Sequence, residues 1–365
     1  MSRKGVKLLS LLMIFTMLTG CSSTPASNQG EALNGYNNEI VVNVEENNLE
    51  STDTLNEAIV EETVEETIIE ETNDLLNPIE VKFIDVGQAD SCLIVTANND
   101  AILVDAGEDR DAEEIIEVIE EYDLEDIDLM VLTHPHADHI GGAKTILEKY
   151  KVKEVMMCSF VSTSKLFSNL LSTLESQELN VIQAEIGKTF NIDDVAIQVV
   201  GTDSVPDDNN NSSIVMKVTY GTVDMLLAGD AEIPAEKVIL ENGFDLTAEV
   251  LKLGHHGSRT SSGDEFLATV QPKIGIISCG LDNKYGLPDE DVLSRLDSHK
   301  VQYYRTDEVG TVTLEIDGEN IVTSLEENFE AINARSGLFL YTPNVAEVGL
   351  ELEDVVVENV AENLN

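Results

Sequence analysis

The stretch THPHADHIGG, residues 133–142, holds three of the six histidines of this 365-residue chain. It directly follows the apolar run of residues 127–132, which predicts a strand that ends where the histidines begin. Imidazole and carboxylate groups suit zinc, manganese or iron, and crowding them into one loop is unfavourable unless a cation offsets their desolvation and repulsion. Because Pro135 and the Gly141-Gly142 pair favour a loop that runs into a helix, side chains from this stretch can diverge toward two metals.

Two later segments place the same ligand types directly after apolar runs. LLAGD, residues 226–230, ends in a carboxylate, and LKLGHHGS, residues 251–258, brings two adjacent imidazoles. Asp230 has an alternative role as the N-cap of a helix over residues 231–240. Adjacent histidines followed by a glycine are harder to explain without a function, so the two segments extend the candidate metal site.

Strand and helix signals surround these segments over residues 81–324. Three short strands are predicted before the histidine loop, at residues 81–86, 92–95 and 101–104, and then a helix at 112–122. After the loop, strands are predicted at residues 153–157, 181–184, 195–200, 213–219, 223–227, 249–253, 273–278, 301–304, 311–315 and 321–324, and helices at 163–175, 231–240, 262–269 and 289–298. This order predicts an α/β fold in which two β-sheets pack face to face with helices outside.

The two ends of the chain carry other signals. Basic residues precede an apolar run at residues 8–18 that is too short for a mature membrane-spanning helix, and LTGC, residues 18–21, resembles the bacterial lipobox. We expect residues 1–21 to be a lipoprotein signal peptide with Cys21 lipidated; an ordinary signal peptide with a chance cysteine is the alternative. The protein is then extracytoplasmic and anchored by this lipid to the bacterial cell membrane.

Composition divides the remaining chain into three parts. Residues 22–78 are predicted to be a disordered acidic tether, and residues 79–326 the folded domain. The acidic tail of residues 327–365 is open to three interpretations: an extra strand, an interaction segment or disorder.

Charge and cysteine content limit the partners and the covalent framework. The 70 acidic and 21 basic residues give a formal charge of −49, which repels polyanions and disfavours non-specific nucleic-acid binding. With no tryptophan and 5% aromatic residues, the chain offers few positions on which single-stranded bases can stack. Cys92, Cys158 and Cys279 lie in apolar runs at wide spacing, which predicts buried small side chains and no disulfide framework.

Residues 80–324 resemble the metallo-β-lactamase superfamily, and within it the hydrolase domain of ComEC-type DNA-uptake proteins. FIDVGQAD, residues 83–90, matches that subgroup's D-V-G-Q-G-D with Ala89 in place of a glycine. LVDAG, residues 103–107, matches the strand whose aspartate orients a histidine of the site. The resemblance implies an αββα sandwich of two mixed sheets, and supporting roles behind the metal ligands for Asp85 and Asp105.

The same resemblance implies two divalent metal ions, zinc or manganese, bridged by Asp230. The other implied ligands are His134 and His136 on one ion, and Asp138, His139 and either His255 or His256 on the other. A bridging water, acidified to hydroxide, would attack a phosphorus or carbonyl centre, and Asp138 is also a candidate catalytic proton acceptor. The candidate substrate contacts are Asn210, Ser258, Arg259 and Tyr285.

Two departures from the family pattern bear on the chemistry. Many superfamily members carry a further histidine ligand before the bridging aspartate, but no histidine lies between His139 and His255 here. The matching segment NNNSS, residues 209–213, resembles an N-x-x-S run of ComEC-type domains, and harder ligands there favour manganese over zinc. NKYGLP, residues 283–288, has Leu287 where the subgroup has a histidine, and leucine neither ligates a metal nor donates a proton.

Three functions fit these residues. The first is an extracytoplasmic phosphoesterase that acts on a small phosphoester or on nucleic acid, although the charge disfavours long duplexes. The second is hydrolysis of an amide, lactone or thioester, including β-lactams, which fold-level analogy does not separate from the first. The third is a non-catalytic accessory protein anchored at the cell surface, which Leu287 and the long acidic flanks favour.

Overall fold

The structure of the chain, a computed structural model, describes residues 76–323, 325, 330–333 and 339–341. The predicted signal peptide with Cys21, and most of the predicted tether and tail, lie outside the described residues. Among the residues that the structure describes, no helix combines the length and the apolar character needed to cross a membrane.

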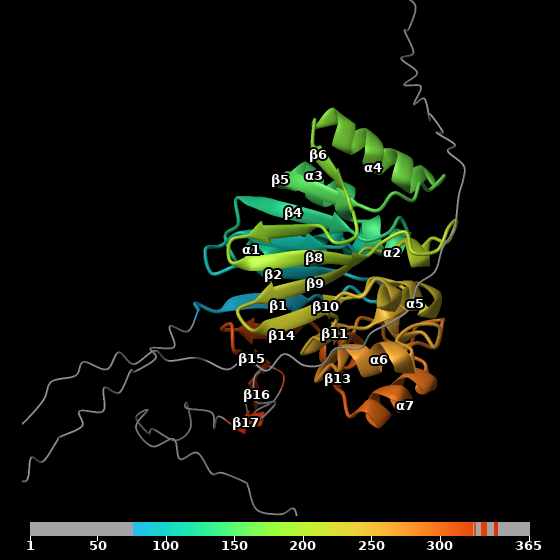
Figure 1. Cartoon of the computed structure of the whole chain (residues 1–365). Helices are drawn as coiled ribbons and strands as arrows, with labels where there is room; N and C mark the ends of the chain where they lie inside the picture. The colour runs from blue at the N-terminus through green and yellow to red at the C-terminus, as the bar shows by residue number, and fades with distance from the viewer. Residues whose placement is uncertain (1–75, 324, 326–329, 334–338, 342–365) are drawn as a thin grey trace, which may run out of the picture. The chain divides into compact units, whose positions relative to one another are not determined.

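Two β-sheets form the centre of the fold (Figure 1). The first has ten strands in the order β17-β16-β15-β14-β1-β2-β3-β4-β5-β6, and the second has seven in the order β13-β12-β11-β10-β9-β8-β7. The strands of the first sheet are β1 (Ile79–Phe83), β2 (Cys92–Val95), β3 (Ala101–Val104), β4 (Asp126–Leu132), β5 (Lys151–Met157), β6 (Asn180–Gln183), β14 (Val312–Ile316), β15 (Asn320–Thr323), β16 (Glu330–Asn333) and β17 (Phe339–Tyr341). Those of the second are β7 (Thr189–Ile192), β8 (Val195–Gly201), β9 (Val215–Tyr220), β10 (Val223–Leu227), β11 (Val250–Lys252), β12 (Ile274–Ile277) and β13 (Gln302–Arg305).

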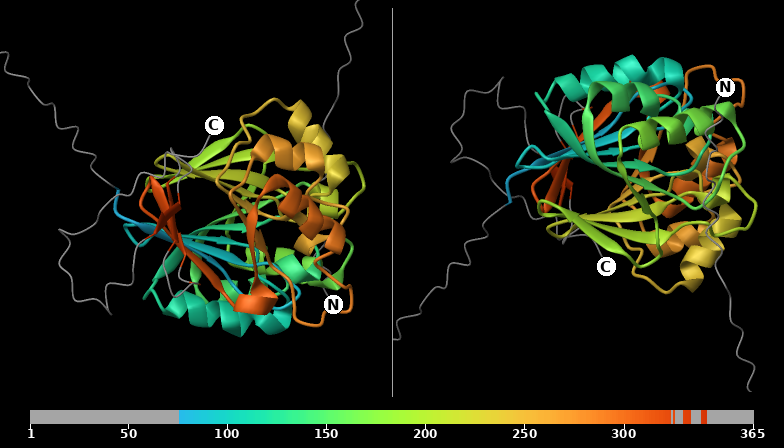
Figure 2. Two further views of the ribbon diagram at one scale, coloured as in Figure 1. Left: turned by 90° about the horizontal axis from the view of Figure 1, so that it is seen from below. Right: turned by 90° about the horizontal axis from the view of Figure 1, so that it is seen from above.

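Helices cover the outer faces of both sheets, so that the layers run helix, sheet, sheet, helix (Figure 2). On the first sheet lie α1 (Ala112–Glu120), α3 (Ala143–Lys149) and α4 (Lys165–Ser176), and on the second α5 (Ile233–Glu241), α6 (Asp264–Val270) and α7 (Glu290–His299). The short helices are η1 (Asp109–Asp111), α2 (Ala137–Ile140), η2 (Asn210–Ser212), η3 (Gly254–Gly257) and α8 (Thr306–Val309). Each helical layer has its own apolar core, and a third core fills the space between the sheets.

Successive residues of one strand pack into different hydrophobic cores. In β3, Ile102 and Val104 belong to the core between the sheets, whereas Leu103 belongs to the core under α1, α3 and α4. A strand that is buried on both faces reads as a continuous apolar run without alternation. The same holds for the end of β4, the strand before the histidine loop, where Leu129 and Val131 belong to the core between the sheets and Met130 and Leu132 to the other core. This is why that strand can be recognised in the sequence.

The predicted order of elements and the sandwich of two mixed sheets are confirmed. The prediction gave no range for α3, and it omitted β7, a partly exposed strand at the edge of the second sheet whose residues alternate polar and apolar. The alternative in which Asp230 caps α5 is wrong, because Glu232 occupies the N-cap and Pro234 stands in the first turn. β16 and β17 lie in the segment interpreted as a tail, where an extra strand was one of the three alternatives.

The cysteines behave as expected for small side chains of the interior. Cys92 and Cys279 are buried and Cys158 is partly buried, and none of the three forms a disulfide.

Candidate metal centre

The candidate ligands lie at the ends of strands from both sheets. His134 and His136 follow β4, Asp230 follows β10, and His256 lies in η3 after β11. β3 runs parallel to β4, and β10 runs parallel to β11, so each pair opens its carboxyl ends at one edge of its sheet. Ligand-binding loops gather at such edges in α/β folds. The face-to-face packing of the sheets brings the two sets of loops together.

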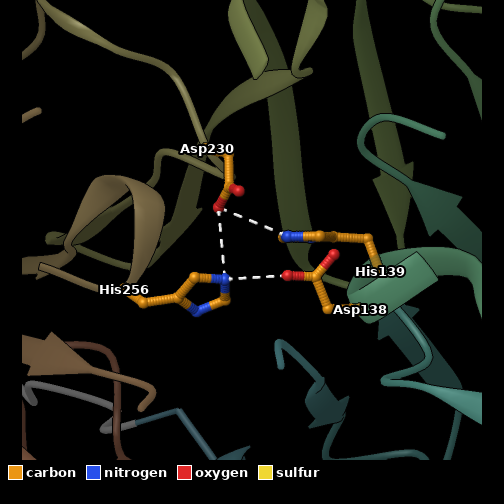
Figure 3. Close-up of side chains that lie close together, drawn as sticks. All are labelled: Asp138, His139, Asp230 and His256. Carbon is orange, nitrogen blue, oxygen red and sulfur yellow. Dashed lines mark hydrogen bonds and ion pairs between the residues drawn. The ribbon is translucent and has the colours of Figure 1, made fainter. Parts of the chain in front are cut away.

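Four side chains form a first cluster, here called the four-donor group: Asp138, His139, Asp230 and His256 (Figure 3). One ligand atom from each lies within 4.8 Å of all the others. His139 Nε2 is 3.3 Å from Asp230 Oδ1, and His256 Nε2 is 3.3 Å from Asp138 Oδ2 and 3.9 Å from Asp230 Oδ1. Four nitrogen and oxygen donors at these separations can surround one cation.

A second cluster, the three-donor group, consists of His134, His136 and the same Asp230. His134 Nε2 lies 3.7 Å from Asp230 Oδ2 and 2.9 Å from His136 Nδ1. Asp230 therefore presents Oδ1 to the four-donor group and Oδ2 to the three-donor group. One carboxylate shared in this way is the geometry of a bridging ligand.

Two buried atoms test whether these residues fit a metal. His139 Nε2 and Asp230 Oδ1 have no hydrogen-bond partner among the described residues, although they face each other across 3.3 Å. Two ligands at about 2.0–2.1 Å from a tetrahedral zinc ion lie about 3.4 Å apart. Buried polar atoms are otherwise almost always paired, so this orphaned pair fits a divalent cation between the two atoms.

Burial and neighbouring carboxylates divide the imidazoles into two classes. Burial opposes protonation of His139, but Asp230 and then Asp105 outweigh it and raise its pKa well above the ordinary value. Burial likewise lowers the pKa of His256, while carboxylates led by Asp230 raise it to about 10. For His134, burial and then the charge of His139 hold the pKa well below the ordinary value. The four-donor group thus attracts positive charge strongly, and a divalent cation can replace its protons.

Asp105 holds His139 from behind, as the sequence predicts. Its Oδ2 lies 2.7 Å from His139 Nδ1, and Thr133 donates to both carboxylate oxygens, from its backbone N–H and from its hydroxyl, at 2.8 Å each. A carboxylate that accepts from Nδ1–H leaves the Nε2 lone pair free for a metal. The whole assembly is buried, so its geometry is fixed before any ligand arrives.

A second supporting carboxylate, Asp90, is absent from the sequence predictions. Asp90 Oδ1 lies 3.3 Å from His256 Nδ1, which also lies 3.0 Å from the backbone oxygen of Ser278. Asp90 Oδ2 accepts a hydrogen bond of 2.8 Å from the buried ammonium of Lys252. The available signal was a lysine within the apolar run of residues 250–253, since a lysine is almost never fully buried without a partner.

The predicted supporting role of Asp85 is wrong. Asp85 is exposed, its Oδ1 accepts from the backbone N–H of Gly87, and its own N–H donates to the hydroxyl of Thr311. Gly87 has φ of +68°, so the chain reverses immediately after Asp85 and carries the last residue of the motif, Asp90, to the ligands instead.

The adjacent His255 and His256 diverge because both adopt a left-handed backbone, with φ of 49° and 53°. Such a conformation is uncommon for residues other than glycine and is typical of strained functional sites. His256 joins the four-donor group, whereas His255 lies on the other side of Asp230, with its Nε2 4.0 Å from Asp230 Oδ2. His255 Nδ1 is 3.1 Å from Glu232 Oε1. Of the two alternatives for this group, the structure brings in His256.

A cleft of about 870 Å³ opens over both groups. Its lining includes the donors His136, Asp138, Asp230 and His256, the neighbouring His255, and the predicted contacts Asn210 and Tyr285. Five residues that were not among the predicted contacts also line it: Gln88, Glu108, Arg110, Leu281 and Lys284.

Ser258 and Arg259 do not line this cleft, contrary to prediction. The Ser258 hydroxyl pairs with that of Thr260 at 2.9 Å, and the guanidinium of Arg259 binds Asp289 at 2.8 Å. Proximity to the histidines along the chain suggested these two residues, but a carboxylate next to α7 holds the arginine away from the cleft.

Comparisons with known proteins agree with this geometry. Residues 84–281 match the model of the metallo-beta-lactamase superfamily. ComE operon protein 3 of Bacillus subtilis (strain 168) is 31% identical over 252 residues, which cover 64% of this chain and 32% of that protein. Recombination protein 2 of Haemophilus influenzae is 30% identical over 226 residues, which cover 60% of this chain and 27% of that protein. The chain thus spans about a third of the length of these relatives.

Among solved structures, the metallo-beta-lactamase fold protein YhfI from Bacillus subtilis matches with a TM-score of 0.46 and 12% identity, covering 65% of this chain and 99% of that one. The resemblance to the superfamily and to ComEC-type proteins, stated from the sequence motifs, is confirmed by the family match and by the relatives.

Proposed function

Because this chain belongs to the metallo-beta-lactamase superfamily, we propose that its cleft is the active site of a phosphoesterase that uses two divalent metal ions. The observation that carries the proposal is Asp230, whose two carboxylate oxygens face two separate groups of buried donors. One ion would be held by the three-donor group and the other by the four-donor group. Zinc and manganese both accept such nitrogen and oxygen ligands.

Divalent ions held there would supply Lewis acidity, which lowers the pKa of water and polarises a phosphoryl or carbonyl oxygen. The protein itself supplies position and proton transfer. Asp138 is the most exposed member of the four-donor group, with 29% of its side chain exposed against 3% or less for the others. It is therefore the carboxylate best placed to meet a substrate and to accept a proton from the attacking water.

One feature of the cleft lining favours an anionic substrate. Lys284 contributes a cation to the cleft and has no carboxylate partner among the described residues. Asn210 also lines the cleft, and its buried Oδ1 has no hydrogen-bond partner among the described residues, which leaves an acceptor for a substrate hydroxyl. A small phosphoester fits this combination better than a neutral amide or lactone. The alternatives are hydrolysis of a thioester, an amide or a lactone, including β-lactams, and the test below compares a phosphodiester with a lactone and a β-lactam.

A second candidate, a non-catalytic accessory protein, is favoured by Leu287. This side chain lines the cleft at the position where the resembling subgroup has a histidine. A protein of this kind would bind the metals without turning over a substrate.

The proposed location is extracytoplasmic, with the lipid on Cys21 as the membrane anchor. It rests on the LTGC segment and the preceding apolar run. Radiolabelled palmitate should enter the protein in bacterial cells, and Cys21→Ser should abolish the labelling. Equal labelling of both forms would contradict the anchor.

The experiment that tests the function combines metal analysis with a panel of nitrophenyl phosphodiester, DNA, lactone and nitrocefin substrates. We expect two equivalents of metal per chain and turnover of the phosphodiester, which His134→Ala abolishes. The matched control is His299→Ala, because His299 lies at the end of α7 against Asp264 and not in the cleft. Metal without turnover of any substrate would favour the accessory role, and purified protein without metal would end the hydrolase proposal.

A further inference from the structure

Two large apolar side chains stand exposed among the residues that line the cleft. Leu281 is 75% exposed and Tyr285 is 63% exposed, and both line the cleft. The other large apolar residues that are exposed in the described part of the chain, such as Val161 and Leu171, lie outside it. Single exposed apolar residues need no explanation, but a pair beside a binding cleft marks a contact surface.

The loop that carries these side chains is held in place by its own hydrogen bonds. The side-chain amide of Asn283 donates to the backbone oxygens of Gly280 and Leu287 at 2.9 and 2.6 Å, and its Oδ1 accepts from the N–H groups of Tyr285 and Leu287 at 3.2 and 3.0 Å. A surface that is ordered before binding loses less conformational entropy when a ligand arrives.

The base of the loop is also fixed against the first motif. The N–H of Gly280 donates to Gln88 Oε1 at 3.1 Å. A Cβ on residue 280 would lie 2.8 Å from the backbone nitrogen of Gln88, so only glycine allows this approach. The loop therefore keeps a constant position relative to the metal ligands.

A cation accompanies the aromatic ring. Lys284 Nζ lies 4.8 Å from the centre of the Tyr285 ring, and within the described residues it has no carboxylate partner. Arg110, which also lines the cleft, is already paired with Glu108 and Asp111, at 3.1 and 3.3 Å. Lys284 is thus the cation of the cleft with charge left to offer an anion, and it stands over one face of an exposed aromatic ring.

From this arrangement we infer that Leu281 and Tyr285 form a platform on which a nucleobase of the substrate stacks, while Lys284 contacts a neighbouring phosphate. The inference rests on the proposed phosphoesterase function and names its substrate class: nucleotides or the ends of short single strands. A planar ring joined to an anion matches an exposed tyrosine beside an unpaired ammonium. The charge of −49 disfavours long duplexes, because their repulsion grows with every added phosphate.

The kinetic test compares two phosphodiesters that share a leaving group. Thymidine 5′-(p-nitrophenyl phosphate) carries a base, and methyl p-nitrophenyl phosphate does not. We expect the native protein to favour the thymidine ester in kcat/KM by about 5- to 150-fold, which is the range for one stacked base. Tyr285→Ala should lower this ratio toward one, and Tyr285→Phe should keep most of it. Leu171→Ala, an exposed apolar residue of α4 outside the cleft, is the matched control and should leave the ratio unchanged.

A binding test separates this inference from the function on which it rests. Calorimetry compares thymidine 5′-monophosphate with 2-deoxyribose 5-phosphate, which has the same phosphate and sugar but no base. A preference for the nucleotide of at least about 5-fold that Tyr285→Ala removes supports the platform even if neither ester is hydrolysed. Turnover of both esters at equal kcat/KM, with equal binding of both phosphates, overturns the platform and leaves the phosphoesterase standing.

Discussion

Replacing Lys252 by methionine isolates the charge that supports the metal centre from behind. The lysine is buried in β11, with 6% of its side chain exposed, and it donates to Asp90 Oδ2 at 2.8 Å and to the backbone oxygen of Leu253 at 3.1 Å. Methionine keeps most of the volume and removes the positive charge. Asp90, which is equally buried, then retains only His256 as an ion-pair partner among the described residues.

The expected loss of stability is that of a buried carboxylate without its partner, about 3–5 kcal/mol. The size of this loss should depend on pH. Burial opposes ionisation of Asp90, but Lys252 and then His256 outweigh it and hold its pKa well below the ordinary value. In the native protein the Asp90–Lys252 pair therefore stabilises the fold fully above pH 3.8, and this stabilisation is lost as the pH falls below that value. The difference between the native protein and Lys252→Met should grow as the pH rises from about 4 and then level off.

The assay is urea unfolding of the chelator-treated protein at pH 5 and pH 8, extended to a double-mutant cycle with Asp90→Asn. Neutralising both partners should recover at least about 2 kcal/mol relative to Lys252→Met, because no uncompensated charge remains. Lys284→Met is the matched control, since Lys284 has no carboxylate partner in the described chain, and it should change stability by less than about 0.5 kcal/mol. A loss below about 1 kcal/mol in Lys252→Met, or additive effects in the cycle, would refute the reasoning.

Three further predictions follow from the same geometry. Asp105→Asn should weaken metal binding about 10- to 100-fold in competition with a chelator, because Asp105 orients His139; Asp85→Asn, at a carboxylate that does not reach the site, should leave the affinity unchanged. Metal affinity should rise steeply between pH 6.5 and 8.5, because the raised pKa values of His139 and His256 mean that the cation must displace two protons. Calorimetry in two buffers would detect the release of these protons. A metal affinity that does not change with pH would contradict the assignment of these two histidines as ligands. Burial raises the pKa of Glu236 to about 7, so its contribution to stability should fall as the pH rises from 4.5 to 7. Urea unfolding at pH 5 and pH 8 should show this loss, of up to about 3 kcal/mol, in the native protein and not in Glu236→Gln. An equal difference in stability between the two proteins at both pH values would be the contrary result.

The sequence was informative where local chemistry decides the structure. Strands such as β3 and β4 are buried on both faces, so they stand out as apolar runs, and the polar residues that follow them mark the edge at which the loops meet. β7 lacked this signal because it lies at the edge of its sheet and is only half buried. The order of the elements was therefore predictable, and the exposed edge strand was not.

The details of the site depend on backbone conformation and on contacts between distant residues. The left-handed turn at Gly87 decides that Asp90 and not Asp85 reaches the ligands, and the left-handed pair in η3 decides between His255 and His256. Likewise, Arg259 is drawn from the cleft by a carboxylate 30 positions away. None of these follows from residue type or from spacing within a motif.

The segment where other family members carry a further histidine ligand has a different role here. Its Ser213 hydroxyl accepts from the backbone N–H of Asp230 at 3.0 Å and lies 3.2 Å from His134 Nδ1, so it joins two ligands of the three-donor group. Zinc sites with four protein donors are closed and structural, whereas catalytic sites have three and keep a position open. A cation held by the three-donor group would have fewer protein donors than one held by the four-donor group, so it would leave more room for a substrate in the cleft that Asp138 also lines. His255 lies beside the three-donor group, and its Nδ1 is engaged with Glu232, so its Nε2 is left to meet either a cation or the substrate.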